Sequence, residues 1–278
     1  MKKISRRSFM AAAAVSVAAL ALTACGGSAS SAASSVASSA ASSEAVSSAA
    51  AAELTTVEAG KLTMATNAAF PPYEMTTDAG EFEGIDVDTA KAIAEKLGLE
   101  LQIDDMDFDA ALLSVQQGKA DIVMAGVTVT DERKAVMDFS DSYATGIQSI
   151  IVPEGSDIAS PDDLAGKKIG TQRGTTGYIY CSDDFGDENV VAYDDGLTAV
   201  QALNNGQVDA VVIDNAPAQE FVAANPGLKV LDTSYAEEDY AIGMAKGSSL
   251  EAAVNAALEE LKADGTLQAI VDKYITAE

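Results

Sequence analysis

Histidine and tryptophan are absent from the 278-residue chain, and only two cysteines are present. Without histidine, the chain has no Ser-His-Asp or Cys-His catalytic arrangement and no histidine ligand for a metal ion. Cys25 and Cys181 do not indicate a disulfide framework, because Cys25 belongs to an N-terminal motif described below. We therefore expect Cys181 to be a small buried apolar residue, and we expect neither a metal nor a cofactor.

Lysine and arginine are scarce, with 17 against 43 Asp and Glu and a formal net charge of −26. The first 24 residues contain four of these cations and no acid, so the remainder has a net charge of −30. A surface this acidic repels a phosphate backbone, which excludes nucleic acid as a partner. We interpret the acid excess as a source of solubility rather than as a binding signal.

The N-terminal region is organised as an export signal followed by a tether. Residues 1–24 place Lys2, Lys3, Arg6 and Arg7 before an apolar run, residues 11–22, that is too short to cross a bilayer core of about 30 Å. The motif Leu22-Thr23-Ala24-Cys25 resembles a lipobox, which implies an extracytoplasmic protein anchored to the cell membrane by lipid on Cys25 alone. Residues 25–53 are almost entirely Ser, Ala and Gly, a composition typical of a flexible tether.

The paired arginines leave the export route open. Ser5-Arg6-Arg7-Ser8-Phe9-Met10 resembles the twin-arginine motif, but paired arginines also occur in ordinary signal peptides. The sequence therefore does not distinguish the twin-arginine from the general export pathway.

From residue 54 onward the hydrophobic pattern alternates between strand and helix. Residues 86–97 have apolar side chains on one helical face and end at Gly98, and residues 108–117 form a second helix that ends at Gly118. Strands are expected over residues 62–66, 99–103 and 120–125. This alternation, with apolar strands, predicts an α/β fold with a mostly parallel sheet covered on both faces.

An internal repeat indicates two similar lobes. Residues 108–126 and 196–214 are both a helix, a glycine turn, an Asp and an apolar strand, and residues 60–66 loosely match residues 166–172. Units of this kind recur in unrelated folds, so each pair alone is weak, but two pairs in the same order favour two lobes. Because ligands bind beyond the carboxyl ends of strands in open α/β sheets, facing lobes would bring these strand ends together in one cleft.

Two apolar, β-like segments, residues 143–152 and 239–244, would carry the chain between the lobes. We predict a first lobe from residues 54–143 plus 242–278, a second lobe from residues 148–237, and a two-strand hinge at 144–147 and 238–241. In the C-terminal part, Ser248 and Glu251 have the spacing of a capping box at the start of a helix. Two crossings suit a hinge motion.

Several motifs of the folded part resemble the amino-acid-binding family of bacterial extracellular solute-binding proteins, of the glutamine- and histidine-binding type. The resemblance covers about residues 56–275 and rests on Gly84-Ile85-Asp86-Val87-Asp88, Ala125-Gly126-Val127-Thr128-Val129-Thr130-Asp131-Glu132-Arg133, Asp138-Phe139-Ser140, Gly174-Thr175-Thr176-Gly177 and Val212-Ile213-Asp214. It implies a two-lobe, periplasmic-binding-protein-like fold. It also implies a monomer that captures a free amino acid and delivers it to the permease of an ABC importer.

The resemblance assigns the ligand's carboxylate to Arg133, whose planar guanidinium can form two parallel charge-assisted bonds. Outside this motif, Arg133 would be interpreted as a surface residue of the loop 131–133. The resemblance adds donors from Thr128, from the backbone at Ala125 and Gly126, and from the turn Thr175-Thr176.

The resemblance assigns the ligand's ammonium to Asp214, which follows four apolar strand residues, and to the carbonyl of Gly126. Asp214 could instead cap the helix that follows. Phe70 and Phe108 would enclose the ligand's side chain, although either could be an ordinary core residue. Asn67, Gln172 and Asp109 lie near its tip in the family pattern. Asparagine at position 67, where binders of cationic side chains tend to have a carboxylate, favours a polar, uncharged ligand.

Two other functions are compatible with this fold. Cyclohexadienyl dehydratases resemble these binding proteins, so the chain could be an enzyme, which would need a positioned acid or base. It could also be a sensory module that reports the ligand to a kinase or a channel. The Arg133 and Asp214 pair favours binding, but it identifies neither the amino acid nor the permease.

Overall fold

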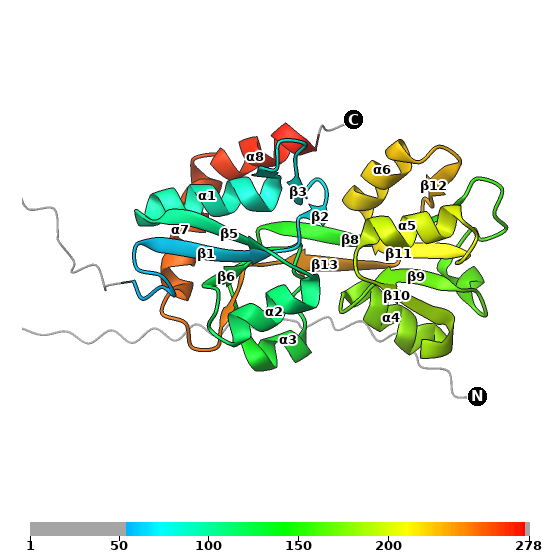
Figure 1. Ribbon diagram of the computed structural model, residues 1–278, viewed down its shortest axis with the longest axis horizontal. Helices are drawn as coiled ribbons and strands as arrows, with labels where there is room; N and C mark the ends of the chain where they lie inside the picture. The colour runs from blue at the N-terminus through cyan, green and yellow to red at the C-terminus, as the bar shows by residue number, and fades with distance from the viewer. Residues whose placement is uncertain (1–53, 276–278) are drawn as a thin grey trace, which may run out of the picture. The chain divides into compact units, whose positions relative to one another are not determined.

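The computed structural model describes residues 54–275, in which two sheets each have helices on both faces (Figure 1). Both sheets belong to one compact unit of the chain. The α/β class and the two-lobe arrangement predicted from the sequence are confirmed. The signal peptide, Cys25 and the Ser/Ala-rich tether lie outside the described residues.

The first lobe is built on a five-stranded mixed sheet. Its parallel part places the central strand β1 between β5 and β6, and β14 then runs antiparallel to both β6 and β7. In sheet order the strands are β5 (Glu100–Asp105), β1 (Lys61–Thr66), β6 (Ile122–Val123), β14 (Gly243–Ala245) and β7 (Met137–Phe139). A small antiparallel sheet lies beside it, formed by β2 (Ala69–Phe70), β3 (Glu74–Thr76) and β4 (Phe82–Glu83).

Helices α1, α2 and α7 form where the sequence predicted helices, whereas α3 includes residues 131–133, which were interpreted from the sequence as a loop. Helix α1 ends because Gly98 adopts the left-handed conformation (φ 69°) and donates its N–H to the carbonyls of the last turn. The capping box predicted at Ser248 and Glu251 is wrong, because α7 begins at Glu251 and Ser248 Oγ instead accepts the N–H of Leu250. The helices are α1 (Ile85–Leu97), α2 (Phe108–Gln116), α3 (Asp131–Val136), α7 (Glu251–Ala263) and α8 (Thr266–Tyr274).

The second lobe has a six-stranded sheet in which β9 runs parallel to β10 and β11, whereas β8 runs antiparallel to β11, β12 and β13. Its strands are β8 (Ala144–Pro153), β9 (Ile169–Gln172), β10 (Val190–Tyr193), β11 (Ala210–Asp214), β12 (Leu228–Val230) and β13 (Ala236–Tyr240). Its helices are α4 (Thr176–Phe185), α5 (Gly196–Asn204) and α6 (Asn215–Ala224), with 3-10 turns η1 (Pro161–Leu164) and η2 (Asp187–Asn189).

Strands β8 and β13 carry the chain between the lobes as an antiparallel pair, in which Tyr240 lies opposite Ala144 and Ala236 opposite Gln148 (Figure 1). The first crossing is also joined to the second by a 3.0 Å bond from Tyr143 N to the carbonyl of Tyr240. Two adjacent crossing strands can bend together, which is the geometry of a hinge.

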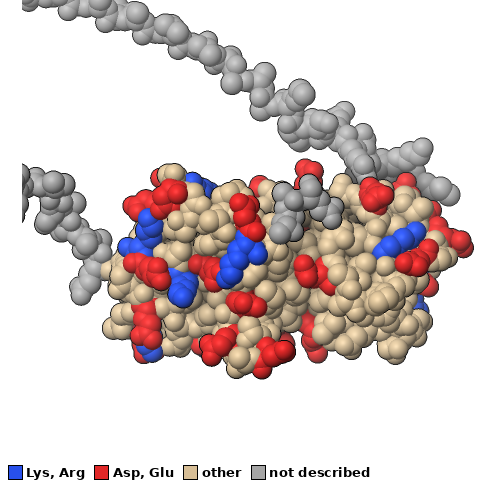
Figure 2. Space-filling view, turned by 90° about the horizontal axis from the view of Figure 1, so that it is seen from above, with Lys and Arg blue, Asp and Glu red and all other residues tan. Residues whose placement is uncertain are grey.

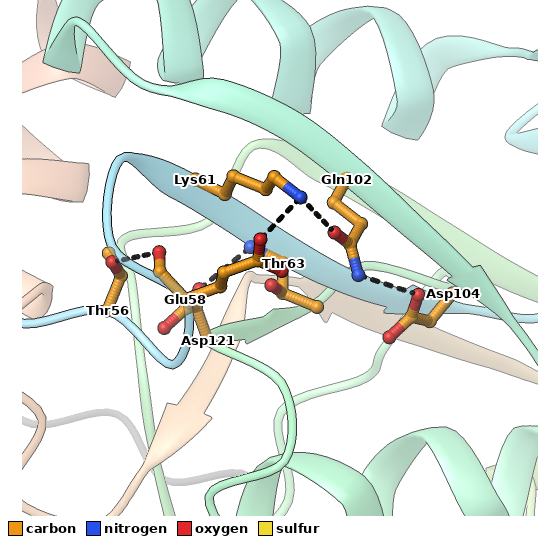
Figure 3. Close-up of polar contacts among 7 residues, drawn as sticks. All are labelled: Thr56, Glu58, Lys61, Thr63, Gln102, Asp104 and Asp121. Atoms are coloured by element: carbon orange, nitrogen blue, oxygen red, sulfur yellow. Dashed lines mark hydrogen bonds and ion pairs between the residues drawn. The ribbon is translucent and has the colours of Figure 1, made fainter.

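The internal repeat is visible in backbone detail. Gly118 and Gly206, the glycines that follow α2 and α5, have nearly the same left-handed φ of 65° and 67°. Three residues after each glycine, an Asp accepts a backbone N–H from the neighbouring parallel strand or from the residue directly before that strand. Asp121 accepts Thr63 N at 2.7 Å, and Asp209 accepts Lys168 N at 2.8 Å (Figure 3 shows Asp121). The same glycine turn and the same Asp hydrogen bond therefore precede β6 in the first lobe and β11 in the second.

The interior and surface follow the composition. Cys181 is fully buried within α4 among apolar residues of the second lobe, as predicted.

On the face in Figure 2, Asp and Glu are spread over the molecule among fewer Lys and Arg. Within residues 54–275, no helix is both long and apolar enough to cross a membrane, and no three potential metal-ligating side chains cluster.

Candidate functional site

A cavity lined by charged, polar and aromatic residues lies where the carboxyl ends of the strands of the two lobes meet. Strands β1, β6, β9 and β11 all end at it, as expected for facing α/β sheets. The residues that line it surround about 310 Å³ of empty space, part of which is open to solvent. The structure brings all eleven predicted ligand-binding residues to its lining, namely Asn67, Phe70, Phe108, Ala125, Gly126, Thr128, Arg133, Gln172, Thr175, Thr176 and Asp214. We call this space the interlobe cavity.

Arg133 supplies the positive charge of the interlobe cavity. Its helix α3 starts at the N-cap Thr130, whose hydroxyl accepts Arg133 N at 3.2 Å. Arg133 is only 8% exposed, so the alternative of a surface arginine is wrong. It donates to the carbonyl of Thr128 at 2.7 Å and to that of Gly174, in the other lobe, at 3.1 Å. Burial lowers the pKa of Arg133, and the nearby carboxylate of Glu238 offsets part of this lowering.

Asp214 supplies a carboxylate to the same cavity. It accepts hydrogen bonds from the hydroxyl of Tyr240 and, at 2.8 Å, from Nε2 of Gln148. It makes no side-chain cap to α6, so the capping alternative is wrong. Burial raises the pKa of Asp214 to about 7, with a further contribution from the charge of Glu238.

Two amides join the lobes at another part of the lining. Gln172 Nε2 donates to Asn67 Oδ1 at 2.8 Å, and Asn67 Nδ2 donates to the carbonyl of Met106 at 3.0 Å. By contrast, Asp109 is exposed and lines a separate pocket with Arg173 and Asp194, so its predicted place near the ligand is not supported.

The glycine at position 126 is required by geometry. It has a left-handed φ of 55°, and a Cβ there would lie 2.8 Å from a ring carbon of Phe70. Its N–H donates to Asp86 Oδ2 at 2.9 Å, and Asp86 also accepts the hydroxyl of Tyr143 at 2.7 Å. The family-like motif at residues 84–88 therefore supports the backbone of the cavity through Asp86.

Both predicted aromatic residues are buried against the cavity. The Phe108 ring lies under the guanidinium of Arg133, 5.3 Å from ring centre to Cζ, and Phe70 stacks on Tyr73. Of the three threonines, Thr175 uses its hydroxyl as the N-cap of α4, where it accepts Tyr178 N. Thr128 and Thr176 instead direct their hydroxyls toward Glu238.

Glu74 lines the interlobe cavity, and sequence reasoning missed it. The side chain is fully buried on β3, and neither carboxyl oxygen has a hydrogen-bond partner among the described residues. Burial raises the pKa of Glu74 well above its ordinary value, and the neighbouring charge of Asp86 raises it further. The available signal was an acid between Tyr73 and Met75, four residues after the aromatic Phe70.

Two α/β lobes, two crossing strands and a cavity with opposite charges between the lobes define a two-lobe ligand-binding protein. Comparison with known sequences agrees with this class. Residues 62–277 match the bacterial extracellular solute-binding proteins, family 3, and the chain belongs to that family.

Named relatives cover most of the chain. A probable histidine-binding protein of Neisseria gonorrhoeae is 34% identical over 96% of this chain and 95% of its own. The solved arginine-, lysine-, histidine-binding protein ArtJ of Geobacillus stearothermophilus has a TM-score of 0.75 and 36% identity, covering 78% of this chain and 96% of its own. An ancestral arginine-binding protein bound to glutamine has a TM-score of 0.75 and 42% identity, covering 78% of this chain and 99% of its own.

Proposed function

We propose that this solute-binding protein captures a free amino acid in the interlobe cavity and delivers it to the permease of an ABC importer. The supporting observation is the placement of buried Arg133 and buried Asp214 on one cavity. Buried charges need partners of opposite sign, and an amino acid zwitterion provides both. A thermal-shift screen of the full chain against the proteinogenic amino acids tests this, because a ligand specific for the folded state raises its stability. No shift with any of them would contradict the proposal.

The ligand's carboxylate would bind Arg133. The guanidinium already donates to the carbonyls of Thr128 and Gly174, and it has five N–H groups in all, so donors remain for a carboxylate. Thr128 and Thr176 flank this place, one from each lobe. The ligand's ammonium would bind Asp214 and the carbonyl of Gly126.

We propose a polar, uncharged side chain for the ligand. Asn67 and Gln172 present amides rather than charges, and burial raises the pKa of Glu74, which disfavours its charged form. The glutamine bound by the ancestral relative is a ligand of this kind. Phe70 and Phe108 would pack against the apolar part of the side chain.

A cationic side chain is the second candidate, and Glu74 is the observation that favours it. Its two oxygens have no partner among the described residues, and a guanidinium or ammonium could bind them and ionise the carboxyl. Relatives named for histidine, arginine and lysine agree with this candidate.

Arginine and its neutral isostere citrulline distinguish the two candidates when titrated into the wild-type chain and Glu74→Gln. An uncharged ligand should bind Glu74→Gln within about threefold of the wild type, because glutamine resembles a protonated glutamate. A cationic ligand should lose about a hundredfold, as expected when one partner of a buried ion pair is removed. A preference for arginine over citrulline that disappears in Glu74→Gln would overturn the uncharged assignment.

We propose a binding role rather than an enzymatic one. Glu74 is a buried carboxyl that lines the cavity, so an enzyme on this fold would have a candidate general acid there. The binding role is supported by the relatives above, which are named as binding proteins. Mass spectrometry of the amino acid recovered after prolonged incubation tests this, and a chemically altered ligand would contradict it.

We also propose that the protein works outside the cytoplasm as a monomer, held to the membrane by lipid on Cys25 and separated from it by the tether of residues 25–53. The lipobox-like motif and the family support this proposal. Mass spectrometry of the mature protein should show an acylated Cys25 at its N-terminus. An unmodified Cys25 would refute the anchor without affecting the binding proposal.

A further inference from the structure

A buried carboxylate lies in the hinge and is not part of the lining of the interlobe cavity. Glu238 is on β13, opposite Gly146 of β8, and is 6% exposed. A buried carboxylate is costly unless it is hydrogen-bonded, and the partners of Glu238 among the described residues all bind one oxygen, Oε2, whereas Oε1 has none.

The partners of Glu238 come from both lobes. Its Oε2 accepts Thr128 Oγ1 at 3.1 Å from the first lobe, and Thr176 Oγ1 and Gln148 Nε2, each at 3.0 Å, from the second. We call these four residues the Glu238 cluster. Thr128 and Thr176 also line the interlobe cavity, whereas Glu238 lies behind them.

Because Thr128 and Thr176 belong to different lobes and donate to the same oxygen, the orientation of their hydroxyls depends on the distance between the lobes. Thr128 and Thr176 Oγ1 atoms lie only 3.4 Å apart, so any opening between the lobes at this point separates them. Opening must then break at least one bond to Glu238, and a hydrogen bond to a charged group is stronger than one between neutral groups. The threonines in turn flank Arg133, which bridges the same two lobes through Thr128 and Gly174.

We propose that Glu238 is a positioning residue that holds the two lobes closed and orients the hydroxyls of Thr128 and Thr176 at the cavity. The closing role follows from the interlobe contacts alone, whereas its effect on affinity rests on the proposed amino-acid binding.

Closure can be measured without ligand through a disulfide between the lobes. A Cβ on Gly174 would lie 2.7 Å from Cγ of Asp109, which places cysteines at these two positions within disulfide reach in the closed arrangement. The left-handed φ of 74° at Gly174 strains the new cysteine, and this strain is the same in every variant compared. Neither residue belongs to the Glu238 cluster. The rate of disulfide formation in the Asp109→Cys, Gly174→Cys chain, followed by peptide mass spectrometry, reports how often the lobes are closed.

In this background, Glu238→Ala should slow disulfide formation by about tenfold or more, since it removes the oxygen that accepts from Thr128 of one lobe and from Thr176 of the other. Glu238→Gln keeps an acceptor oxygen and the side-chain shape, so it should recover part of the rate. Glu237→Ala and Glu237→Gln are matched controls, because Glu237 is an exposed neighbour on the same strand. Both should leave the rate unchanged.

Thr128→Val tests whether the hydroxyl acts through Glu238. It should slow disulfide formation in the wild-type background and have no further effect when combined with Glu238→Ala. Ligand titrations use chains without the cysteines introduced at positions 109 and 174. In these, Glu238→Ala should raise the dissociation rate of the ligand about tenfold and leave its association rate nearly unchanged.

The proposal would be overturned if Glu238→Ala formed the disulfide at a rate within twofold of that of the Asp109→Cys, Gly174→Cys parent. It would also be overturned if the effects of Glu238→Ala and Thr128→Val on this rate were fully additive. If Glu238→Ala does not fold, Glu238→Gln takes its place in this comparison. A disulfide formation rate of Glu238→Gln equal to that of the control Glu237→Gln would then contradict the proposal. Because the disulfide measurement uses no ligand, it remains valid even if the amino-acid proposal fails.

Discussion

Arg133 and Gly174 are joined across the lobes by a 3.1 Å hydrogen bond from Nη2 to the glycine carbonyl. The residue proposed to hold the ligand's carboxylate therefore also connects the lobes that enclose it. Only a planar guanidinium can reach the carbonyls of Thr128 and Gly174 and still present parallel donors to a carboxylate. We therefore expect closure and recognition to depend on the shape of this side chain as well as on its charge.

Arg133→Lys should weaken amino acid binding by about a hundredfold, although it keeps the positive charge. A single ammonium cannot replace the planar set of donors, and the carbonyl of Gly174 would lose its partner. Isothermal titration measures the effect. Lys134→Arg is the control, since it changes the neighbouring exposed residue and should leave affinity unchanged. A lysine variant with affinity near that of the wild type would show that charge alone is sufficient.

Amino acid binding should tighten as the pH rises through about 7. Asp214 has a pKa raised to about 7 in the protein, and a bound ammonium would favour its charged form, so binding releases a proton below that pH. The affinity should fall by up to about a hundredfold between pH 8 and pH 5. The chain has no histidine that could produce the same dependence. Calorimetry at pH 6 in buffers of different ionisation enthalpy measures the proton, and equal heats in all buffers would contradict this assignment.

The same carboxyl makes a separate prediction for the unliganded fold. Its folded pKa lies above the unfolded value of 3.8, so the folded chain binds more protons, and this contribution to stability is complete at low pH and is lost as the pH rises from about 4 to 7. Asp214→Asn should flatten part of that decline in denaturant titrations. Asp86, with a pKa raised to about 6 mainly by burial, should account for a further part. An unchanged slope in Asp214→Asn would show that the carboxyl does not titrate there.

Gly126→Ala should impair both the fold and binding. The left-handed φ of 55° costs an alanine about 1–2 kcal/mol, and the new Cβ would displace Phe70. Gly118→Ala is the matched control, because its φ is 65° but its Cβ would meet nothing within 4 Å. Only the change at 126 should reduce affinity, by about tenfold or more, in a titration. Equal affinities for the two variants would remove Gly126 from the site.

The residues that could be predicted from the sequence share a position in the repeat or in a local motif. Asp214 and Gly126 lie at equivalent places after the two glycine turns, so the topology of parallel sheets was enough to bring them together. The eleven predicted residues reached one cavity for the same reason.

The residues that were missed depend on contacts between distant segments. Gln148, Glu238 and Tyr240 belong to the hinge strands, and the sequence of a strand does not show which polar side chain of another segment it will meet. Ser248 was assigned a cap by spacing alone, but the helix starts two residues later than that spacing required. Local patterns therefore predicted the elements and the strand ends, but not the hydrogen bonds between the lobes.

The central claim is that Arg133 holds the ligand's carboxylate. It is tested most directly by titrating the wild type and Arg133→Ala with the preferred amino acid and with its amide, which lacks the carboxylate charge but keeps the ammonium. The wild type should bind the amide at least about a hundredfold more weakly than the amino acid, because a buried ion pair is lost. Arg133→Ala should bind the two equally. If Arg133→Ala still prefers the amino acid by the wild-type factor, another group holds the carboxylate, and the proposed site is wrong at its centre.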